Sequence, residues 1–296
     1  MSFWTPEFDR FAAPARTRPA LWRFFAGLVL LVVVYIACLA GIFGLIALIG
    51  GESALIHWMQ RVEQAAGPTA TLILLATFGG VILGLWAALR LIHGRGLSTT
   101  LGPAGLGRRG FQRAALITAA GLVLSMALFL PRIEILPNLP WAIWASFLPL
   151  ALCLIALQTG AEEMLFRGYL QQELATRFAN PLVWMLLPSI LFGLAHYDPG
   201  AAGEIAWMVA LAAGLFGLLA ADLTRRTGHI GAAWGMHFAN NCFAILGISV
   251  QGTIPGLSLY TTELAISDAA EIAPLLWQDM AMTVLLYLAV RWAVAR

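Results

Sequence analysis

Eight apolar runs of roughly membrane-spanning length follow one another along this chain of 296 residues. Hydrophobic residues make up 60% of the sequence and charged residues only 11%, whereas a soluble domain contains about 25% charged residues. A helix that crosses a bilayer needs about 20 predominantly apolar residues. We therefore predict an all-α fold, a polytopic membrane helical bundle of about eight transmembrane helices within the lipid bilayer. The runs occupy residues 24–49, 69–92, 114–131, 141–170, 181–197, 204–223, 230–250 and 273–293.

The positions of the basic residues, all 17 of them arginines, predict the orientation of the chain. Short cytoplasmic loops of membrane proteins carry an excess of basic residues. We expect the N-terminus and the C-terminus to be cytoplasmic in a multi-pass protein of the cell membrane. Residues 1–23 form a cytoplasmic arm in this interpretation, and residues 24–296 form a single transmembrane domain. Only Arg61 and Arg132 fall outside, where the 251–272 loop is acidic.

Several other features limit the classes of partner and site. The net charge of +2, with no basic stripe, argues against a nucleic-acid partner. Cys38, Cys153 and Cys242 lie singly in apolar segments, which predicts neither disulfides nor a thiolate metal site. Small residues at Gly80 and Gly84, and at Gly214 and Gly217, allow close helix contacts. The sequence does not predict an oligomeric state.

One apolar run contains the charged sequence Glu162-Glu163-Met164-Leu165-Phe166-Arg167. An ionisable residue inside a membrane helix is costly and marks a functional site by default. Glu163 and Arg167 are four residues apart, so they share a helix face and can pair. Glu162 is rotated roughly 100° from Glu163 and has no partner in its own helix. In an apolar cavity a lone carboxylate is a stronger base, so Glu162 is the candidate general base.

Two later runs contain the remaining polar groups. His196 lies one turn after Phe192, and His237 and Asn241 are four residues apart on one helix face. Counting from the 177–181 loop at 1.5 Å per residue places Glu162 and His196 at matched depths of roughly 22 Å. His237 and Asn241 fall in the same layer, so we expect the four side chains to converge.

These residues resemble the motifs of the CAAX prenyl protease and bacteriocin-processing family of intramembrane proteases, also called CPBP or Abi, which includes the type-2 CAAX (Ras-converting) protease. The pattern EExxxR is present as Glu162, Glu163 and Arg167. FxxxH is present as Phe192 and His196, and HxxxN as His237 and Asn241. The resemblance covers about residues 145–250, which would be the catalytic core. An additional histidine, His229, departs from the family pattern, and we interpret it as a loop residue.

The resemblance implies an intramembrane endopeptidase that cleaves a membrane-associated protein or peptide. Glu162 and His196 would activate a water molecule, and His237 and Asn241 would bind the oxyanion of the tetrahedral intermediate. Glu163 and Arg167 would orient and brace this group, with Phe192 in support. The sequence leaves a metal ion undecided. Two histidines and two glutamates (Glu162, Glu163, His196 and His237) could bind Zn²⁺, but no HExxH motif fixes such a site, and we expect no obligatory zinc.

Two alternatives from other classes stay open at this point. A non-catalytic immunity or scaffold protein could keep the same fold, although it would gain nothing from four polar groups placed in a membrane. A transporter is disfavoured because the sequence has no internal repeat. The substrate, and whether it is prenylated, cannot be predicted from the sequence.

Overall fold

The computed structural model describes residues 4–129 and 134–295 of the chain. The predicted all-α membrane bundle is confirmed: among the described residues, 6 helical segments are long and apolar enough to cross a membrane. They are Leu21–Glu63, Pro68–His93, Ala104–Leu128, Trp141–Ala175, Pro199–Thr227 and Ala269–Val294. The predicted runs at 181–197 and 230–250 form shorter helices. The predicted positions of Arg132 and Arg296, and the first three residues of the predicted arm, lie outside the described residues.

The helical elements follow the chain in an unbranched order, and several of the long ones contain π-helical turns. They are α1 (Pro6–Ala12), η1 (Ala13–Thr17), α2 (Leu21–Glu63), α3 (Pro68–Ala76), α4 (Phe78–Ala87), η2 (Ala88–His93), η3 (Leu97–Thr100), α5 (Ala104–Phe129), α6 (Trp141–Leu165), η5 (Phe166–Leu170), α7 (Gln171–Ala175), η6 (Leu182–Leu186), α8 (Leu187–Leu194), α9 (Pro199–Ala202), η7 (Gly203–Ile205), α10 (Ala206–Thr227), α11 (Gly231–Cys242), η8 (Phe243–Gly247), η9 (Pro255–Leu257) and α12 (Ala269–Val294).

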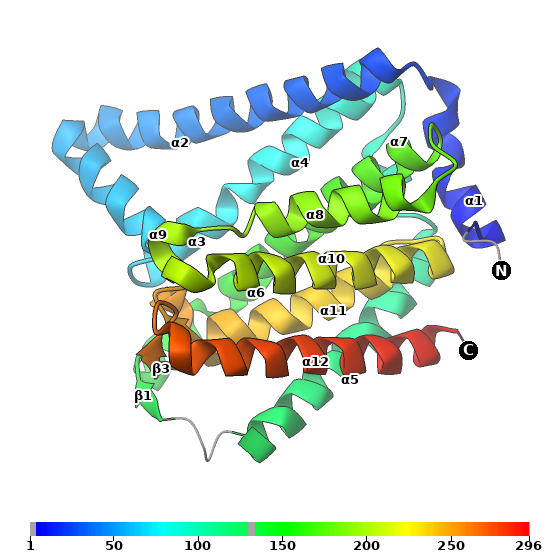
Figure 1. Cartoon of the computed structure of the whole chain (residues 1–296). Coiled ribbons are helices and arrows are strands. Elements are labelled where there is room, and N and C mark those ends of the chain that lie inside the picture. The colour runs from blue at the N-terminus through cyan, green and yellow to red at the C-terminus, as the bar shows by residue number, and fades with distance from the viewer. Residues whose placement is uncertain (1–3, 130–133, 296) are drawn as a thin grey trace.

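Both chain ends lie at the same end of the bundle, and three short strands lie at the opposite end (Figure 1). The strands β1 (Ile135–Pro137), β2 (Ile248–Gln251) and β3 (Tyr260–Ala265) form one sheet in the order β1-β3-β2. β3 pairs antiparallel with β1 and parallel with β2. The sequence analysis treated the region of β3 as an acidic loop. It becomes a strand because Tyr260, Thr261 and Thr262 favour extended backbone and have two neighbours to pair with.

Helix α2 is longer than predicted and extends from Leu21 to Glu63. It bends at Gly51, whose φ of 76° is open to glycine but strained for other residues. Its first half packs on α4, where a Cβ at Gly84 would lie 2.7 Å from the Leu31 carbonyl oxygen. The close helix contact predicted for the Gly80–Gly84 pair is therefore confirmed. Most side chains in the second half of α2 are exposed or half-buried.

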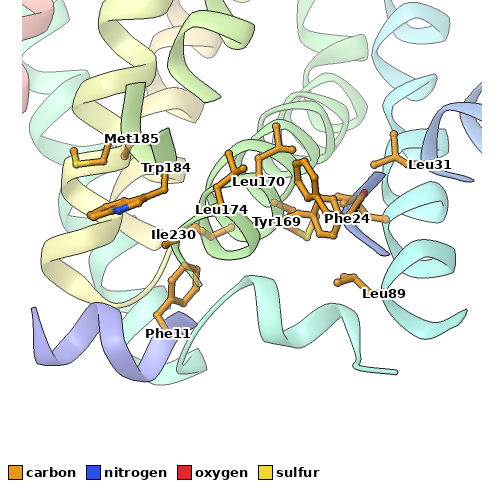
Figure 2. Close-up of a cluster of buried hydrophobic side chains, with 14 of the residues drawn as sticks. Phe11, Phe24, Leu31, Leu89, Tyr169, Leu170, Leu174, Trp184, Met185 and Ile230 are labelled. Atoms are coloured by element: carbon orange, nitrogen blue, oxygen red, sulfur yellow. Dashed lines mark hydrogen bonds between the residues drawn. The ribbon is translucent and has the colours of Figure 1, made fainter. Parts of the chain in front are cut away.

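The N-terminal arm folds against the bundle, although its sequence implied no fold. Thr5 caps α1 by accepting a hydrogen bond from the Phe8 amide at 3.1 Å, and its hydroxyl donates to the Arg225 carbonyl at 2.6 Å. The Phe8 ring stacks on Trp184, with centroids 5.0 Å apart. Figure 2 shows Phe11 and Trp184 at one side of a buried cluster that extends to Tyr169 and Phe24. This cluster anchors α7 and η6, the elements that flank the charged segment of α6.

Glycines bring the central helices close enough for their backbones to touch. A Cβ at Gly193 of α8 would lie 2.5 Å from the Ala210 carbonyl oxygen of α10. Gly235 of α11 similarly faces the Phe111 carbonyl of α5. Both contacts exclude any side chain at the glycine. They fix the rotation of α8 and α11 about their own axes, and so decide which of their side chains face α6.

Candidate active site

The charged segment of α6 ends in a π-helical turn. Glu163 is fully buried near the end of α6, and Arg167 lies in η5, which follows directly. Arg167 Nη1 donates to Glu163 Oε1 at 2.9 Å, so the predicted pair across one helical turn is present. Arg167 Nη2 also donates to the Gly217 carbonyl of α10 at 3.2 Å. The buried guanidinium is thus held by a carboxylate and a backbone carbonyl, as a charge in a low-dielectric interior requires.

His237 of α11 stands between the two glutamates. Its Nδ1 lies 2.9 Å from Glu163 Oε1, and its Nε2 lies 3.5 Å from Glu162 Oε2. The His237 side chain is buried, and the Glu162 side chain is 13% exposed. The arrangement forms a continuous series of polar groups, Arg167–Glu163–His237–Glu162, in which helices α6 and α11 meet.

The hydrogen-bonding partners indicate the tautomer of His237. A carboxylate only accepts hydrogen bonds, so Nδ1 carries a proton and donates it to Glu163. In the neutral ring, Nε2 then presents a lone pair toward Glu162. Glu162 Oε2 is buried and has no hydrogen-bond partner among the described residues. Two acceptors at 3.5 Å are stabilised by a donor between them, and a water molecule supplies two such protons.

Phe192 and His196 approach this group from α8. The Phe192 ring lies 5.9 Å from the His237 ring and 4.7 Å from the His196 ring, centroid to centroid. It also lies 4.7 Å from the Arg167 guanidinium carbon, a cation–π distance. The motif phenylalanine therefore packs against three of the predicted site residues and fixes their separation.

His196 itself lies just beyond the end of α8 and is exposed. Its Nδ1 hydrogen-bonds to the Phe192 carbonyl at 2.8 Å, which leaves Nε2 as a free acceptor because the carbonyl must accept. His196 makes no direct hydrogen bond or ion pair with Glu162. The two were expected to meet at matched depth, but the direct partner of Glu162 is His237.

Asn241 lies one turn after His237 on α11, as its spacing predicted. Its Nδ2 donates to Gln158 Oε1 at 2.9 Å. Gln158 is four residues before Glu162 on α6 and was overlooked in the sequence, although a glutamine within an apolar run is a recognisable signal. This bond is a second polar link between α6 and α11 and orients the amide of Asn241.

Two further residues escaped sequence reasoning because nothing in the sequence distinguishes them from ordinary helix-packing residues. The Phe216 ring of α10 lies 5.0 Å from the His237 ring. Trp234 Nε1 donates to Thr159 Oγ1 at 3.1 Å, which joins α11 to α6 one turn before the glutamates. The loop histidine His229 is buried, and its Nδ1 accepts a hydrogen bond from the Gly231 amide at the start of α11.

The residues fit a bound metal ion poorly. No group of three or more His, Cys, Asp or Glu side chains in the described ranges has the arrangement of a metal site. Both ring nitrogens of His237 face carboxylates, and Glu163 faces Arg167, so these groups satisfy one another and do not point at a common centre. We derive no step through zinc.

Comparison with known proteins agrees with this geometry. A family model described as type II CAAX prenyl endopeptidase Rce1-like matches residues 141–243. Uncharacterized protein YyaK of Bacillus subtilis (strain 168) is 30% identical over 273 residues, which cover 86% of this chain and 88% of that protein. The chain belongs to the Rce1-like family. No solved structure gives a significant match.

The part of this Rce1-like chain that matches the family model begins with α6 and ends at the first residue of η8. It contains each residue described above, from Gln158 to Asn241. The family is therefore recognised through the helices that build the candidate site, whereas α2 to α5 and α12 surround them.

Proposed function

We propose that the protein is an intramembrane endopeptidase that hydrolyses a peptide bond in a membrane-associated protein or peptide. The observation that carries the proposal is the series Arg167–Glu163–His237–Glu162 inside a membrane-spanning bundle. Three of its four contacts are between groups that are costly to bury, and its terminal carboxylate oxygen, Glu162 Oε2, is left for an external donor. Membership of the Rce1-like family supports protease activity.

In the proposed reaction a water molecule lies between Glu162 Oε2 and His237 Nε2 and donates a hydrogen bond to each. Glu162 removes one proton as the water oxygen attacks the carbonyl carbon of the scissile bond. The C=O electron pair moves to the oxygen and forms a tetrahedral oxyanion. Glu162 then returns its proton to the amide nitrogen as the C–N bond breaks, which releases an amine and a carboxylate.

The surrounding residues have separate roles in this scheme. Glu163, held by Arg167, keeps the Nδ1 proton on His237 and so leaves Nε2 facing the water. Asn241 is the candidate donor to the oxyanion, and such donors contribute about 2.7–4 kcal/mol each. Its amide is held by Gln158 in the absence of substrate. His196, with Nε2 free, is a second base at the exposed side of the site.

The test is to find cut sites directly. Purified protein in proteoliposomes is incubated with a library of acylated and unacylated peptides, and products are mapped by mass spectrometry. The matched control is Glu162→Gln, which keeps the side-chain shape and removes the base. Cleavage by the native protein that the control lacks supports the proposal. Absence of any Glu162-dependent product across the library would favour the non-catalytic scaffold.

A further inference from the structure

A second intramembrane carboxylate, Asp279, lies away from the candidate active site. It is near the middle of α12, about 15 Å along the axis from Ala269 at 1.5 Å per residue, and every stretch of 18 residues within that spanning helix contains it. Asp279 makes no hydrogen bond or ion pair with any described residue. By contrast, Glu163, Glu173 and Asp222 are each paired with an arginine. A charged group without a partner at this depth is a functional-site candidate.

Asp279 lines a cavity of about 570 Å³ that α5, α11 and α12 form together with the sheet. Leu122, Phe243 and Met282 provide apolar walls, and Ser125, Asn240 and Asp279 provide polar groups. All three strands contribute to the lining as well. In Figure 1, α12 begins beside the strands, at the end of the molecule opposite the chain termini. Small-ligand sites have volumes of about 300–1,000 Å³ and the same mixture of walls and polar groups.

The chemistry of the lining selects one class of occupant. A carboxylate repels anions, and a purely apolar ligand would leave it unpaired and desolvated. A bare metal ion would need several oxygen ligands close together, whereas this cavity is wide and mostly apolar. An aliphatic stem that ends in a cation matches both the walls and Asp279, and arginine and lysine side chains have this form. Glu263, Asp268 and Glu271, all exposed at the same end, add negative charge near its approach.

We propose that this cavity is a second substrate-binding site, in which Asp279 pairs with the guanidinium or ammonium group of a membrane-associated peptide. The inference rests on the proposed peptidase function for the nature of the ligand. Helix α11 is the wall that the cavity shares with the candidate active site: Asn240 lines the cavity, and its Nδ2 lies 3.4 Å from Oδ1 of Asn241. A peptide lying along α11 could therefore engage both sites, and Asp279 would select peptides with a basic residue at a fixed distance from the cut.

Binding can be measured without cleavage in the full-length Glu162→Gln protein reconstituted in nanodiscs. The probe is a fluorescein-labelled, leucine-rich peptide with one central arginine, and its twin carries citrulline, the neutral isostere. Fluorescence anisotropy should give a Kd about tenfold lower for the arginine peptide, as a charge-assisted hydrogen bond provides. Adding Asp279→Asn should remove this difference, and Asp279→Glu should retain it. Glu271→Gln, on the exposed start of the same helix, should also retain it.

Equal affinities of the two peptides for the Glu162→Gln protein would overturn the proposal and favour a neutral lipid or apolar ligand in the cavity. A preference that survives Asp279→Asn, or that disappears with Glu271→Gln, would overturn it too, because the peptide would then sense surface charge. The result is independent of proteolysis. Failure to bind leaves the peptidase assay untouched, and failure to cleave leaves the anisotropy measurement interpretable.

Discussion

His237 Nδ1 and Glu163 Oε1 lie 2.9 Å apart, and this contact joins the first and third motifs of the chain across two helices. The same glutamate oxygen accepts the hydrogen bond of Arg167. One carboxylate oxygen therefore holds a cation from its own helix and an imidazole from another. The properties of the site should depend on this oxygen more than on any other single atom, and each element around it can be tested separately.

Removing Arg167 should destabilise the protein more than neutralising Glu162. Arg167→Ala leaves Glu163 as a buried charge without its cation, which costs about 3–5 kcal/mol, whereas Glu162→Gln removes only a partly exposed charge. Thermal unfolding in detergent should show a much lower Tm for Arg167→Ala than for Glu162→Gln. Equal Tm values for the two variants would argue against a structural role for the pair.

His196→Ala and Asn241→Ala should lower kcat while the fold is kept. Loss of a general acid–base group lowers the rate by about 10²–10⁴, and loss of an oxyanion donor by about 10²–10³. Kinetics on any substrate identified by mass spectrometry, with Tm as the control for folding, measures both effects. If His196→Ala retained most of the native kcat, Glu162 and His237 alone would have to activate the water.

Gly160→Ala should impair catalysis through the spacing of α6 and α11. A Cβ at Gly160 would lie 2.8 Å from Cζ2 of the rigid Trp234 ring, so the helices must move apart and lengthen the contact between Glu163 and His237. Displacements of about 1 Å can cost about 10²-fold in rate. The control is Gly44→Ala in α2, where nothing lies within 4 Å of the new carbon. Equal losses in the two variants would contradict the spacing argument.

Acid should loosen the start of α11 through His229. Burial lowers the pKa of His229 below its ordinary value of 6.5, so the folded protein favours the neutral ring, whose Nδ1 accepts from the Gly231 amide. The unfolded chain binds the proton more readily, so this contribution to stability is complete above pH 6.5 and is lost as the pH falls toward the lower folded value. The Tm of the native protein should fall between pH 7 and pH 5 more steeply than that of His229→Asn, whose amide oxygen can accept the same bond without titrating. Parallel curves would exclude His229 as the cause.

The topology predicted from the arginines can be tested by labelling single cysteines. With Cys38, Cys153 and Cys242 replaced, new cysteines are placed at Ala179 and Ser267, which are exposed positions at opposite ends of the bundle. An impermeant thiol reagent added to intact cells should label only the variant at Ser267. Labelling at Ala179 would invert the orientation and place the loop between α7 and α8 outside the cell.

Contacts within one helix were predictable from the sequence, and contacts between helices were not. The spacing of Glu163 and Arg167 determines their pairing because every α-helical turn brings residues four apart together. The spacing of His237 and Asn241 likewise places both on one face. However, spacing does not determine how one helix is rotated against another. The partner of Glu162 was therefore expected to be His196, and the contact with His237 became visible only once α6 and α11 were placed.

The remaining differences have local physical causes. Helix α2 was predicted to end near residue 49, because the apolar run ends there, but residues 52–63 also favour helix and continue it beyond Gly51. Strand β3 exists only through its pairing with two distant segments, which no local pattern reports. Gln158 carried a detectable signal. Phe216 did not, because an aromatic residue in an apolar helix most often fills space.

The pairing of Glu163 with Arg167 inside a single chain segment has a consequence for biosynthesis. Membrane helices enter the bilayer in the order in which the ribosome makes them, so α6 and η5 are complete before α10 and α11 exist. If either charge depended on a later helix for its partner, the nascent segment would have to wait in a polar environment. Because the two groups neutralise each other within one turn, this segment can leave the translocon early. The imidazole of His237 then arrives at a carboxylate that is already in place.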